Sequence, residues 1–552
     1  MTIGRPGMIL YSLVCAWLLT GIALCCSDDT QPTDLRHGLA ASVTTPAPVA
    51  VEGIGPGALI LQGGGKTPPA ILETFLQLSG GEKTRLVVIP TASADAEKTE
   101  TWLARWKEHP FAEVAVLHTL DRKLASTAAF VQPLRQATAV FITGGDQRRL
   151  SDAYAGTLVE EELQALLQRG GVIWGTSAGA AIQTKLVIAG GKPPEIRMAP
   201  GLALLPGCVV DQHFLARQRE PRLRRALEQF PGFVGLGIDE ATALVVRGRT
   251  LRVAGDSTVT VLLAKGAGRP WRKEVLAAKQ TSDLTMLRRA ALERAQPEPR
   301  TGPAGKPFVP VGSLMLVGGG GMPPEIINRF IELAGGKEKT FIVLPTSMPD
   351  PIPPQAGGFL RRAGVEKVHV LTGRSPQFVT DPATLELLDR ADAVWFDGGR
   401  QWRFVDAYAG TPFLEKLRGV LQRGGVIGGS SAGATIQGEY LCRGSPLGPQ
   451  FMMCEGYEQG FAFLPGTAVD QHFTQRNRFR DLYAFRKRYP QYLGIGIDEA
   501  TAIVVQKQGA EVIGKHRVCF YTREPAHEKD FIYVQAGEVF DLESQSVRKV
   551  DK

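Results

Sequence analysis

The apolar positions of the chain fall into short continuous runs that amphipathic stretches separate. In the first half these runs are residues 58–62, 85–91, 114–118, 139–143 and 171–174. Several of them end in glycine-rich turns, and residues 160–168 have the spacing of a helix with an acidic first turn. Short apolar strands that alternate with helices are typical of a mainly parallel sheet covered on both faces. We therefore predict a three-layer α/β fold that binds ligands beyond the carboxyl ends of its strands.

The whole pattern occurs twice. Four blocks recur in the same order: 141–157 as 395–411, 166–183 as 420–437, 204–214 as 463–473, and 236–246 as 495–505. The offset between the copies is 254 residues for the first two blocks and 259 for the last two, so the second copy carries five extra residues in between. Ordered repeats of this length indicate a tandem duplication of one domain.

Changes in composition mark the ends of the two copies. Arg5 precedes an apolar stretch from Met8 to Leu24, which is typical of a signal peptide, and a tether rich in Pro, Thr and Ala follows. The predicted organisation is a signal peptide at 1–26, a flexible linker at 27–55, a first domain at 56–292, a linker at 293–307 and a second domain at 308–552. We expect export to the periplasm or beyond, either as a released protein or with a lipid anchor on Cys25 or Cys26.

The bulk composition excludes several classes of protein. With 44% hydrophobic and 21% charged residues, the chain has the balance of a globular protein. Its net charge of +8 is spread along the sequence, so we expect no nucleic-acid partner. Beyond the signal peptide only Cys208, Cys442, Cys454 and Cys519 remain, which leaves four free thiols or a single Cys442–Cys454 bridge. The sequence contains no metal-binding or nucleotide-binding motif, so it predicts no metal and no cofactor.

A G-x-S-x-G motif occurs once in each copy. Residues 175–179 (Gly-Thr-Ser-Ala-Gly) lie where an apolar strand passes into a helix, and residues 429–433 (Gly-Ser-Ser-Ala-Gly) repeat them. In a nucleophile elbow, glycines on both sides allow a sharp turn that presents the serine at a helix N-terminus. A turn of small residues kept for close packing is the alternative. Duplication in the same setting favours Ser177 and Ser431 as nucleophiles.

A serine nucleophile needs a base and a group that orients the base. The chain has only eight histidines, and His213 and His472 occupy the same place in the repeat, each within Asp-Gln-His-Phe. A structural histidine is the alternative, but duplication beside the duplicated serine favours a catalytic role. The spacing leaves three pairs of carboxylates open: Glu240 and Glu499, Asp211 and Asp470, or Asp239 and Asp498. The candidate oxyanion donors are backbone amides of Ala178, Gly144 and Gly145 and of Ala432, Gly398 and Gly399.

Four motifs together resemble the cyanophycinase and dipeptidase E family of serine peptidases. They are GGDQ-x-R, GTSAGA, DQHF-x-x-R-x-R and GIDE-x-T-A, and they span most of each copy. The resemblance implies a flavodoxin-like, class I glutamine-amidotransferase-like sandwich with a Ser–His–Glu triad. The implied triads are Ser177, His213 and Glu240 in the first copy and Ser431, His472 and Glu499 in the second. The choice of glutamate rests on the resemblance and not on the spacing.

The resemblance also implies a substrate. Cyanophycinases cut a poly-aspartate chain with arginine on each side chain into β-aspartyl-arginine. The implied substrate contacts are Gln147, Asp211, Gln212, Arg217, Arg219 and Arg222 in the first copy and Gln401, Asp470, Gln471, Arg476 and Arg478 in the second. We thus expect an exported serine peptidase for aspartyl or isopeptide bonds, whose copies form an internal pseudo-dimer because cyanophycinases are homodimers. An exopeptidase of short Asp-containing peptides and a non-catalytic binding protein are the alternatives.

The second copy departs from the first at two charged positions. Asp481 stands where the first copy has Arg222, and Arg400 replaces Asp146. Residues 442–458 are also longer than their counterpart and rich in Met, Cys and Gly. These reversals indicate that the two copies differ in specificity, with the first closer to cyanophycinase.

Overall fold

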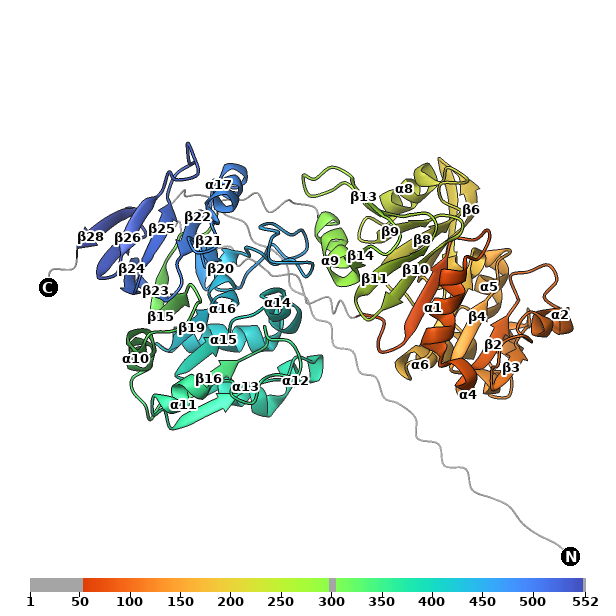
Figure 1. Cartoon of the computed structure of the whole chain (residues 1–552), viewed down its shortest axis with the longest axis horizontal. Helices are drawn as coiled ribbons and strands as arrows, with labels where there is room; N and C mark the ends of the chain where they lie inside the picture. The colour runs from red at the N-terminus through yellow and green to blue at the C-terminus, as the bar shows by residue number, and fades with distance from the viewer. Residues whose placement is uncertain (1–52, 297–303, 550–552) are drawn as a thin grey trace, which may run out of the picture. The chain divides into compact units, whose positions relative to one another are not determined.

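The computed structural model of this chain describes residues 53–296 and 304–549 (Figure 1). The predicted signal peptide, the two candidate lipid-attachment cysteines, most of the first predicted linker and the middle of the second lie outside these residues. Both copies belong to one compact unit of the chain. Among the helices of the described residues, none has the length and the apolar character needed to cross a membrane.

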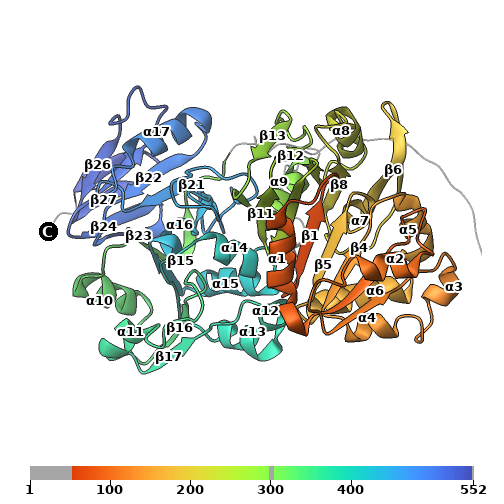
Figure 2. The same ribbon diagram turned by 45° about the vertical axis from the view of Figure 1, so that its right-hand side comes forward.

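The first copy is built on an eight-stranded sheet with the order β14-β11-β10-β1-β5-β4-β2-β3. Five parallel strands form its larger part: β1 (Ala58–Gln62), β2 (Arg85–Ile89), β3 (Glu113–Val116), β4 (Ala139–Ile142) and β5 (Val172–Thr176). Three antiparallel strands extend it: β10 (Thr242–Arg247), β11 (Thr250–Gly255) and β14 (Thr281–Asp283). Figure 2 shows β1, β5 and β4 side by side. The apolar runs of the sequence are these parallel strands.

Alternate residues of the parallel strands face opposite helical layers. Ala58 and Ile60 pack with Phe75 in one apolar cluster, whereas Leu59 and Leu61 belong to another, together with residues of α5 and α6. The helices are α1 (Pro69–Ser79), α2 (Thr99–Ala104), α3 (Arg122–Ala125), α4 (Gln132–Gln136), α5 (Gln147–Tyr154), α6 (Leu158–Gln168), α7 (Ala178–Ala181), α8 (Glu220–Gln229) and α9 (Leu284–Arg294). A strand buried on both faces needs apolar residues at every position, which explains its unbroken apolar run.

A smaller sheet, which the sequence pattern did not reveal, completes the first copy. Its order is β13-β12-β9-β8, with β8 (Cys208–Gln212), β9 (Val234–Ile238), β12 (Val259–Leu263) and β13 (Arg272–Leu276). A hairpin of β6 (Leu186–Lys192) and β7 (Glu195–Pro200) precedes it. Strands β8 and β9 are parallel, and the chain leaves both at the same end, where the candidate histidine and glutamate follow.

The second copy repeats this topology. Its larger sheet has the order β17-β16-β18-β19-β15-β23-β24-β27-β28 and its smaller one β20-β21-β22-β25-β26. The strands are β15 (Val309–Val317), β16 (Thr340–Leu344), β17 (Lys367–Val370), β18 (Ala393–Phe396), β19 (Val426–Ser430), β20 (Gly438–Tyr440), β21 (Leu464–Gln471), β22 (Leu493–Ile497), β23 (Thr501–Lys507), β24 (Gly509–Gly514), β25 (Arg517–Tyr521), β26 (Ile532–Gln535), β27 (Glu538–Asp541) and β28 (Ser546–Lys549). The helices are α10 (Pro324–Leu333), α11 (Gly358–Arg362), α12 (Pro376–Thr380), α13 (Pro382–Asp389), α14 (Trp402–Tyr408), α15 (Pro412–Gln422), α16 (Ala432–Thr435) and α17 (Phe479–Arg488). Two tandem α/β sandwiches result, as predicted, and the second has one more strand in each sheet, β28 at the edge of the larger and β20 at the edge of the smaller.

The four cysteines of the described residues are buried free thiols, so the bridge between Cys442 and Cys454 is not formed. Burial raises the pKa of Cys208 and of Cys454 to about 12. Both thiols are therefore protonated at neutral pH and have the character of small apolar core residues.

Candidate active site

Each candidate serine sits in a strained turn between a strand and a short helix. Ser177 follows β5 and precedes α7 with φ 51° and ψ −111°, and Ser431 has φ 54° and ψ −110° between β19 and α16. A side chain at Gly175 would place its Cβ 1.9 Å from the carbonyl oxygen of Gly179, and one at Gly179 would lie 2.2 Å from that of Ile142. Close packing therefore requires both glycines. A positive φ at a serine costs free energy and is typical of functional sites.

The structure brings serine, histidine and glutamate of the first copy together. The Oγ of Ser177 lies 2.8 Å from Nε2 of His213, and Nδ1 of His213 lies 2.6 Å from Oε1 of Glu240. His213 follows β8 and Glu240 comes two residues after β9, so the parallel pair places both at one sheet end. The His213 side chain is 11% exposed and that of Glu240 41%. This is the arrangement of a nucleophile, a base and an orienting acid.

The second copy has the same geometry. The Oγ of Ser431 lies 2.9 Å from Nε2 of His472, and Nδ1 of His472 lies 2.6 Å from Oε1 of Glu499. The aspartates that the spacing left open have other partners. Asp239 accepts hydrogen bonds from the backbone N–H of Leu215, and Asp498 accepts one from the N–H of Thr474. In each copy the glutamate is thus the carboxylate that contacts the imidazole Nδ1.

Both imidazoles are disposed to be neutral at pH 7. Burial lowers the pKa of His213 and that of His472 below the ordinary 6.5, while the hydrogen bond to the glutamate partly opposes this shift. The charge of Arg217 lowers the pKa of His213 further, and that of Arg476 does the same for His472. A neutral Nε2 with Nδ1 hydrogen-bonded to a carboxylate can accept the serine proton.

Backbone amides beside each serine are free to bind an oxyanion. Within the described residues, the N–H groups of Ala178, Gly144 and Gly145 donate no hydrogen bond. Gly144 adjoins the nucleophile, since a Cβ there would lie 3.3 Å from the Cβ of Ser177. The corresponding amides of the second copy, those of Ala432, Gly398 and Gly399, are also free within the part of the chain that the structure describes.

The glycine-rich turn after the first strand of each copy seats the histidine and the glutamate. A Cβ at Gly64 would lie 2.3 Å from Cε1 of His213, and one at Gly65 would lie 2.9 Å from the Cβ of Glu240. The carbonyl of Gly63 accepts the N–H of His213 at 2.8 Å. Residues 318–320 have the same contacts in the second copy. These turns carry no nucleotide-binding motif, and nothing in their composition predicts this role, although their place at the same point of the repeat is a signal.

The candidate substrate contacts of the first copy divide into a buried group and an exposed one. Asp211 is fully buried and pairs with Arg222, whose Nε lies 2.8 Å from its Oδ2, and with Arg219 at 3.4 Å. Arg219 also donates to the carbonyl of Gln212 at 2.7 Å. Arg217 is exposed, and its side chain has no hydrogen-bond partner among the described residues. The remaining candidate, Gln147, begins α5 and donates to the carbonyl of residue 188 at 2.8 Å.

The second copy has the same buried aspartate with two arginine partners, but one of the two arginines comes from a different position. Asp470 is fully buried and accepts from Arg478 at 2.8 Å, but its second cation is Arg443, not a residue of α17. Arg478 also donates to the side chain of Gln471 at 2.6 Å. The two remaining candidates are Gln401, which donates to the carbonyl of residue 442 at 2.7 Å, and the exposed Arg476. The sequences of the two copies show the loss of the helix arginine at position 481, but they do not show which arginine replaces it.

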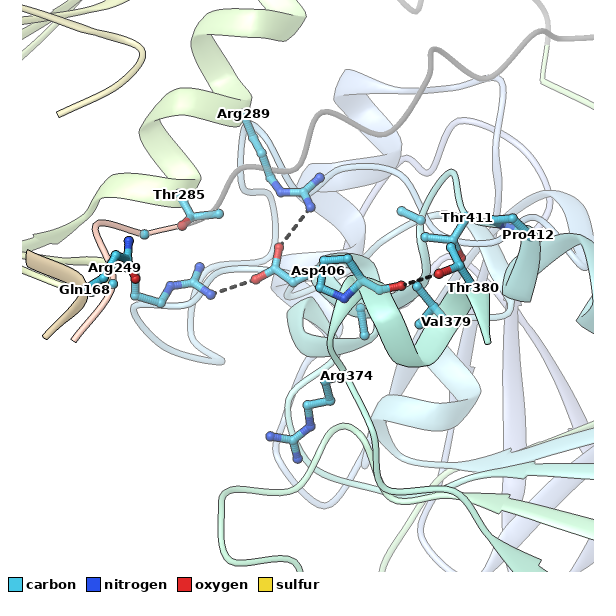
Figure 3. A pocket seen from close by; sticks show the side chains of 16 residues that line it. Gln168, Arg249, Thr285, Arg289, Arg374, Val379, Thr380, Asp406, Thr411 and Pro412 are labelled. Carbon is cyan, nitrogen blue, oxygen red and sulfur yellow. Dashed lines mark hydrogen bonds and ion pairs between the residues drawn. The ribbon is translucent and has the colours of Figure 1, made fainter. Parts of the chain in front are cut away.

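A separate pocket of about 750 Å³ lies away from both triads (Figure 3). It is lined by residues of both copies, and none of the candidate site residues is among them. Its charged side chains are three arginines and one aspartate: Asp406 pairs with Arg249 at 2.7 Å and with Arg289 at 3.0 Å, as Figure 3 shows, and Arg374 pairs with Asp350 outside the lining. The lining contains no serine and no histidine, so it lacks the nucleophile and the base that the triads have. Within residues 53–296 and 304–549, no cluster of His, Cys, Asp and Glu has the form of a metal site.

Comparison with known proteins shows the family of the chain. The model of peptidase family S51 matches residues 59–254 and 314–513, one segment in each copy and together more than half of the chain. A stretch of 201 residues is 35% identical to the cyanophycinase of Geminocystis herdmanii (strain PCC 6308) and covers 35% of this chain and 74% of that protein. The cyanophycinase of Nostoc sp. (strain PCC 7120 / SAG 25.82 / UTEX 2576) is also 35% identical over 201 residues, or 35% of this chain and 67% of the relative.

Among solved structures, the peptidase from an acI-B1 actinobacterium is 24% identical with a TM-score of 0.34, and the match covers 43% of this chain and 98% of that one. The two matched segments of the family model confirm both the tandem duplication and the family resemblance seen in the sequence. This chain therefore belongs to peptidase family S51 and is a serine hydrolase that carries the family's domain twice.

Proposed function

We propose that the protein is an exported peptidase that hydrolyses aspartyl or isopeptide bonds and, like a cyanophycinase, releases β-aspartyl-arginine. The observation that carries the proposal is the same Ser–His–Glu geometry in both copies, each beside unpaired backbone amides. The substrate is inferred from the 35% identity to cyanophycinases. Export is inferred from the sequence of residues 1–26 alone, as is the candidate lipid anchor.

The proposed reaction proceeds through an acyl-enzyme. The Oγ of Ser177 attacks the carbonyl carbon of the substrate while Nε2 of His213 takes its proton. The amides of Ala178 and Gly144 stabilise the oxyanion, and the proton then passes from Nε2 to the leaving nitrogen as the C–N bond breaks. Water next attacks the ester carbonyl, gives a proton to Nε2 and releases the acid, and Nε2 returns that proton to Oγ. In this scheme Glu240 holds the imidazole and stabilises its cationic form.

The charges near the triad suit a substrate rich in carboxylates. Arg217 is exposed and close enough to influence His213 electrostatically, so its guanidinium group can bind a substrate carboxylate. Asp211 has no exposed surface and is occupied by two arginines. We therefore assign it an indirect role, in which it orients Arg219 and Arg222.

The second copy supports a second candidate function for its own site, cleavage of short Asp-containing peptides. Arg400, which replaces an aspartate, donates to the carbonyl of Ser445. Residues 443–445 are buried, whereas none of the hairpin residues 189–199 of the first copy is. A site flanked by a fixed buried segment favours a short substrate over a polymer.

Release of β-aspartyl-arginine from purified cyanophycin tests the proposal. The mature chain is compared with Ser177→Ala, Ser431→Ala and the double variant, and labelling by a serine-directed phosphonate is followed in parallel. Loss of release in Ser177→Ala alone would assign the polymer to the first copy, and loss only in the double variant would assign it to both. Labelling of both serines without release would support a serine hydrolase but reject cyanophycin as its substrate. Absence of labelling would reject the catalytic role of the two triads.

A further inference from the structure

In both copies an arginine forms a bidentate ion pair with the buried aspartate that precedes the histidine by two residues. The two arginines occupy different positions in the repeat. In the first copy, the arginine that forks onto Asp211 is Arg222, in the first turn of α8. In the second copy, Asp481 occupies that helix position. The fork onto Asp470 is made there by Arg443, with Nε 2.9 Å from Oδ1 and Nη2 2.8 Å from Oδ2.

The position of Arg443 in the repeat can be fixed by a shared hydrogen bond. Gln147 donates to the carbonyl of Ile188, and Gln401 donates to that of Cys442, so residues 188 and 442 are equivalent. This agrees with the offset of 254 residues, and the next residues, Ala189 and Arg443, are then also equivalent. The pair Ala189 and Arg222 of the first copy thus corresponds to Arg443 and Asp481 of the second.

Arg443 is more deeply embedded than the arginine that it replaces. Its side chain is 2% exposed, and its other N–H groups donate to Asp481 at 2.7 Å and to the carbonyl of Pro449 at 3.0 Å. The charge reversal at position 481 is therefore compensated within the site, because Asp481 is itself a partner of Arg443. A fully buried carboxylate needs such a cation, since an unpaired one would take up a proton or destabilise the fold.

A short series of hydrogen bonds connects the buried carboxylate with the residue that precedes the histidine. Asp470 also binds Arg478, and Arg478 holds both the carbonyl and the side chain of Gln471, the residue before His472. The first copy has the same order of contacts from Asp211 through Arg219 to the carbonyl of Gln212. A shift of the carboxylate would thus reach the residue next to the imidazole.

We propose that Arg443 is a positioning residue of the second active site and does there what Arg222 does in the first. It acts through Asp470 and Arg478 and touches no reacting atom. The exchange also changes the charge that is exposed beside each site. Asp481 is 43% exposed, whereas the arginine at the equivalent helix position is 13% exposed. The inference rests on the proposed catalytic role of Ser431 and His472.

The chain itself supplies the variants for a test. In a full-length Ser177→Ala parent, the rate of phosphonate labelling of Ser431 measures the second site without any assumption about its substrate. We expect Arg443→Ala to lower this rate at least tenfold, because the fork onto Asp470 is lost. Adding Asp481→Arg recreates the Ala–Arg pair of the first copy and should restore the rate to within threefold of the parent. Arg480→Ala is the control, since this neighbour on α17 is exposed and has no ion pair among the described residues.

The reciprocal exchange tests the same relationship in the first copy. In a Ser431→Ala parent, Arg222→Asp should slow labelling of Ser177 at least tenfold, and adding Ala189→Arg should restore it. Thermal unfolding of every variant separates lost positioning from lost folding. A parent that is not labelled at Ser431 would overturn the proposed catalytic role of Ser431 and this inference with it. Two results would overturn the inference alone. One is a labelled parent whose labelling rate does not fall in Arg443→Ala, and the other is a folded Arg443→Ala/Asp481→Arg variant whose labelling rate does not recover.

Discussion

The indole Nε1 of Trp395 donates a 3.1 Å hydrogen bond to Oδ1 of Asp397, a carboxyl group that is only 9% exposed. Asp397 directly precedes the Gly398–Gly399 turn of the second copy, where the first copy has Thr143. Burial raises the pKa of Asp397 from 3.8 to about 6, and the hydrogen bond from Trp395 opposes this rise. The second copy therefore has a titratable group directly before its candidate oxyanion turn, at a position where the first copy has none.

Replacement of Asp397 by threonine, its counterpart in the first copy, should stabilise the protein at neutral pH. Because the pKa of Asp397 is higher in the folded state than in the unfolded chain, the folded state binds this proton more tightly. Its stability relative to the variant is then greatest below pH 4 and falls as the pH rises through about 6. Above pH 6.5 we expect a gain of about 3 kcal/mol in the free energy of unfolding, since the pKa rises by about 2 and one pKa unit corresponds to about 1.4 kcal/mol. Urea unfolding at pH 4 and pH 7.5 measures it, and equal gains at both would exclude titration as the cause.

Activity of both sites should persist to mildly acidic pH. The pKa of His213 and that of His472 lie below 6.5 because the imidazoles are buried, and the base must be neutral to accept the serine proton. Phosphonate labelling should thus be constant from pH 7.5 to about 6.5 and should fall about tenfold per unit well below the folded-state pKa. Ser431→Ala and Ser177→Ala chains report the two sites separately. A midpoint above pH 7 in either chain would contradict the lowered pKa.

The glutamates should matter more for reactivity than the neighbouring aspartates. Glu240→Gln keeps the shape of the side chain but removes the charge that orients and stabilises the imidazolium, so labelling of Ser177 should fall about 10²- to 10⁴-fold. Asp239→Asn is the matched control: Asp239 accepts the N–H of Leu215 and the hydroxyl of Ser257, so its loss should mainly lower stability. A larger loss of labelling in folded Asp239→Asn would assign the orienting role to the aspartate.

The duplication made the serine and the histidine of each site predictable from the sequence, but it could not identify the acid or the arginine that supports the second site. Ser177 and His213 were found because each recurs in a fixed block, and the unbroken apolar runs identified the parallel strands. Spacing could not choose among the acids, since Asp239 and Glu240 are adjacent in sequence and only side-chain direction separates their roles. Arg443 was missed for a different reason: its pairing with Asp470 spans 27 residues and depends on where a longer segment folds back.

Contacts between the copies were equally hidden from the sequence. The guanidinium group of Arg249 donates to Asp283 at 2.9 Å in its own copy and to Asp406 at 2.7 Å and the Tyr457 hydroxyl at 2.9 Å in the other. Arg249→Met keeps the bulk but removes a cation from Asp283 and leaves Asp406 with Arg289 alone, so we expect a loss of about 2 kcal/mol in stability. Arg252→Met is the control, since this arginine of β11 has no ion pair within the described residues. Equal unfolding midpoints for the two variants would show that the contacts contribute nothing.

The turn after β1 should be as sensitive as the triad itself. Gly64 has φ 102°, and a Cβ there would lie 2.3 Å from Cε1 of His213, so Gly64→Ala must displace the imidazole. Gly80 provides a matched control, because its φ is 101° and a Cβ there would meet nothing within 4 Å. Both variants carry the same backbone cost of about 1–2 kcal/mol for alanine in a left-handed conformation. In a Ser431→Ala parent, we expect Gly64→Ala to slow phosphonate labelling of Ser177 at least a hundredfold and Gly80→Ala to leave it unchanged. A similar loss in both would trace the effect to backbone strain, and no loss in Gly64→Ala would mean that the imidazole can move without consequence for the serine.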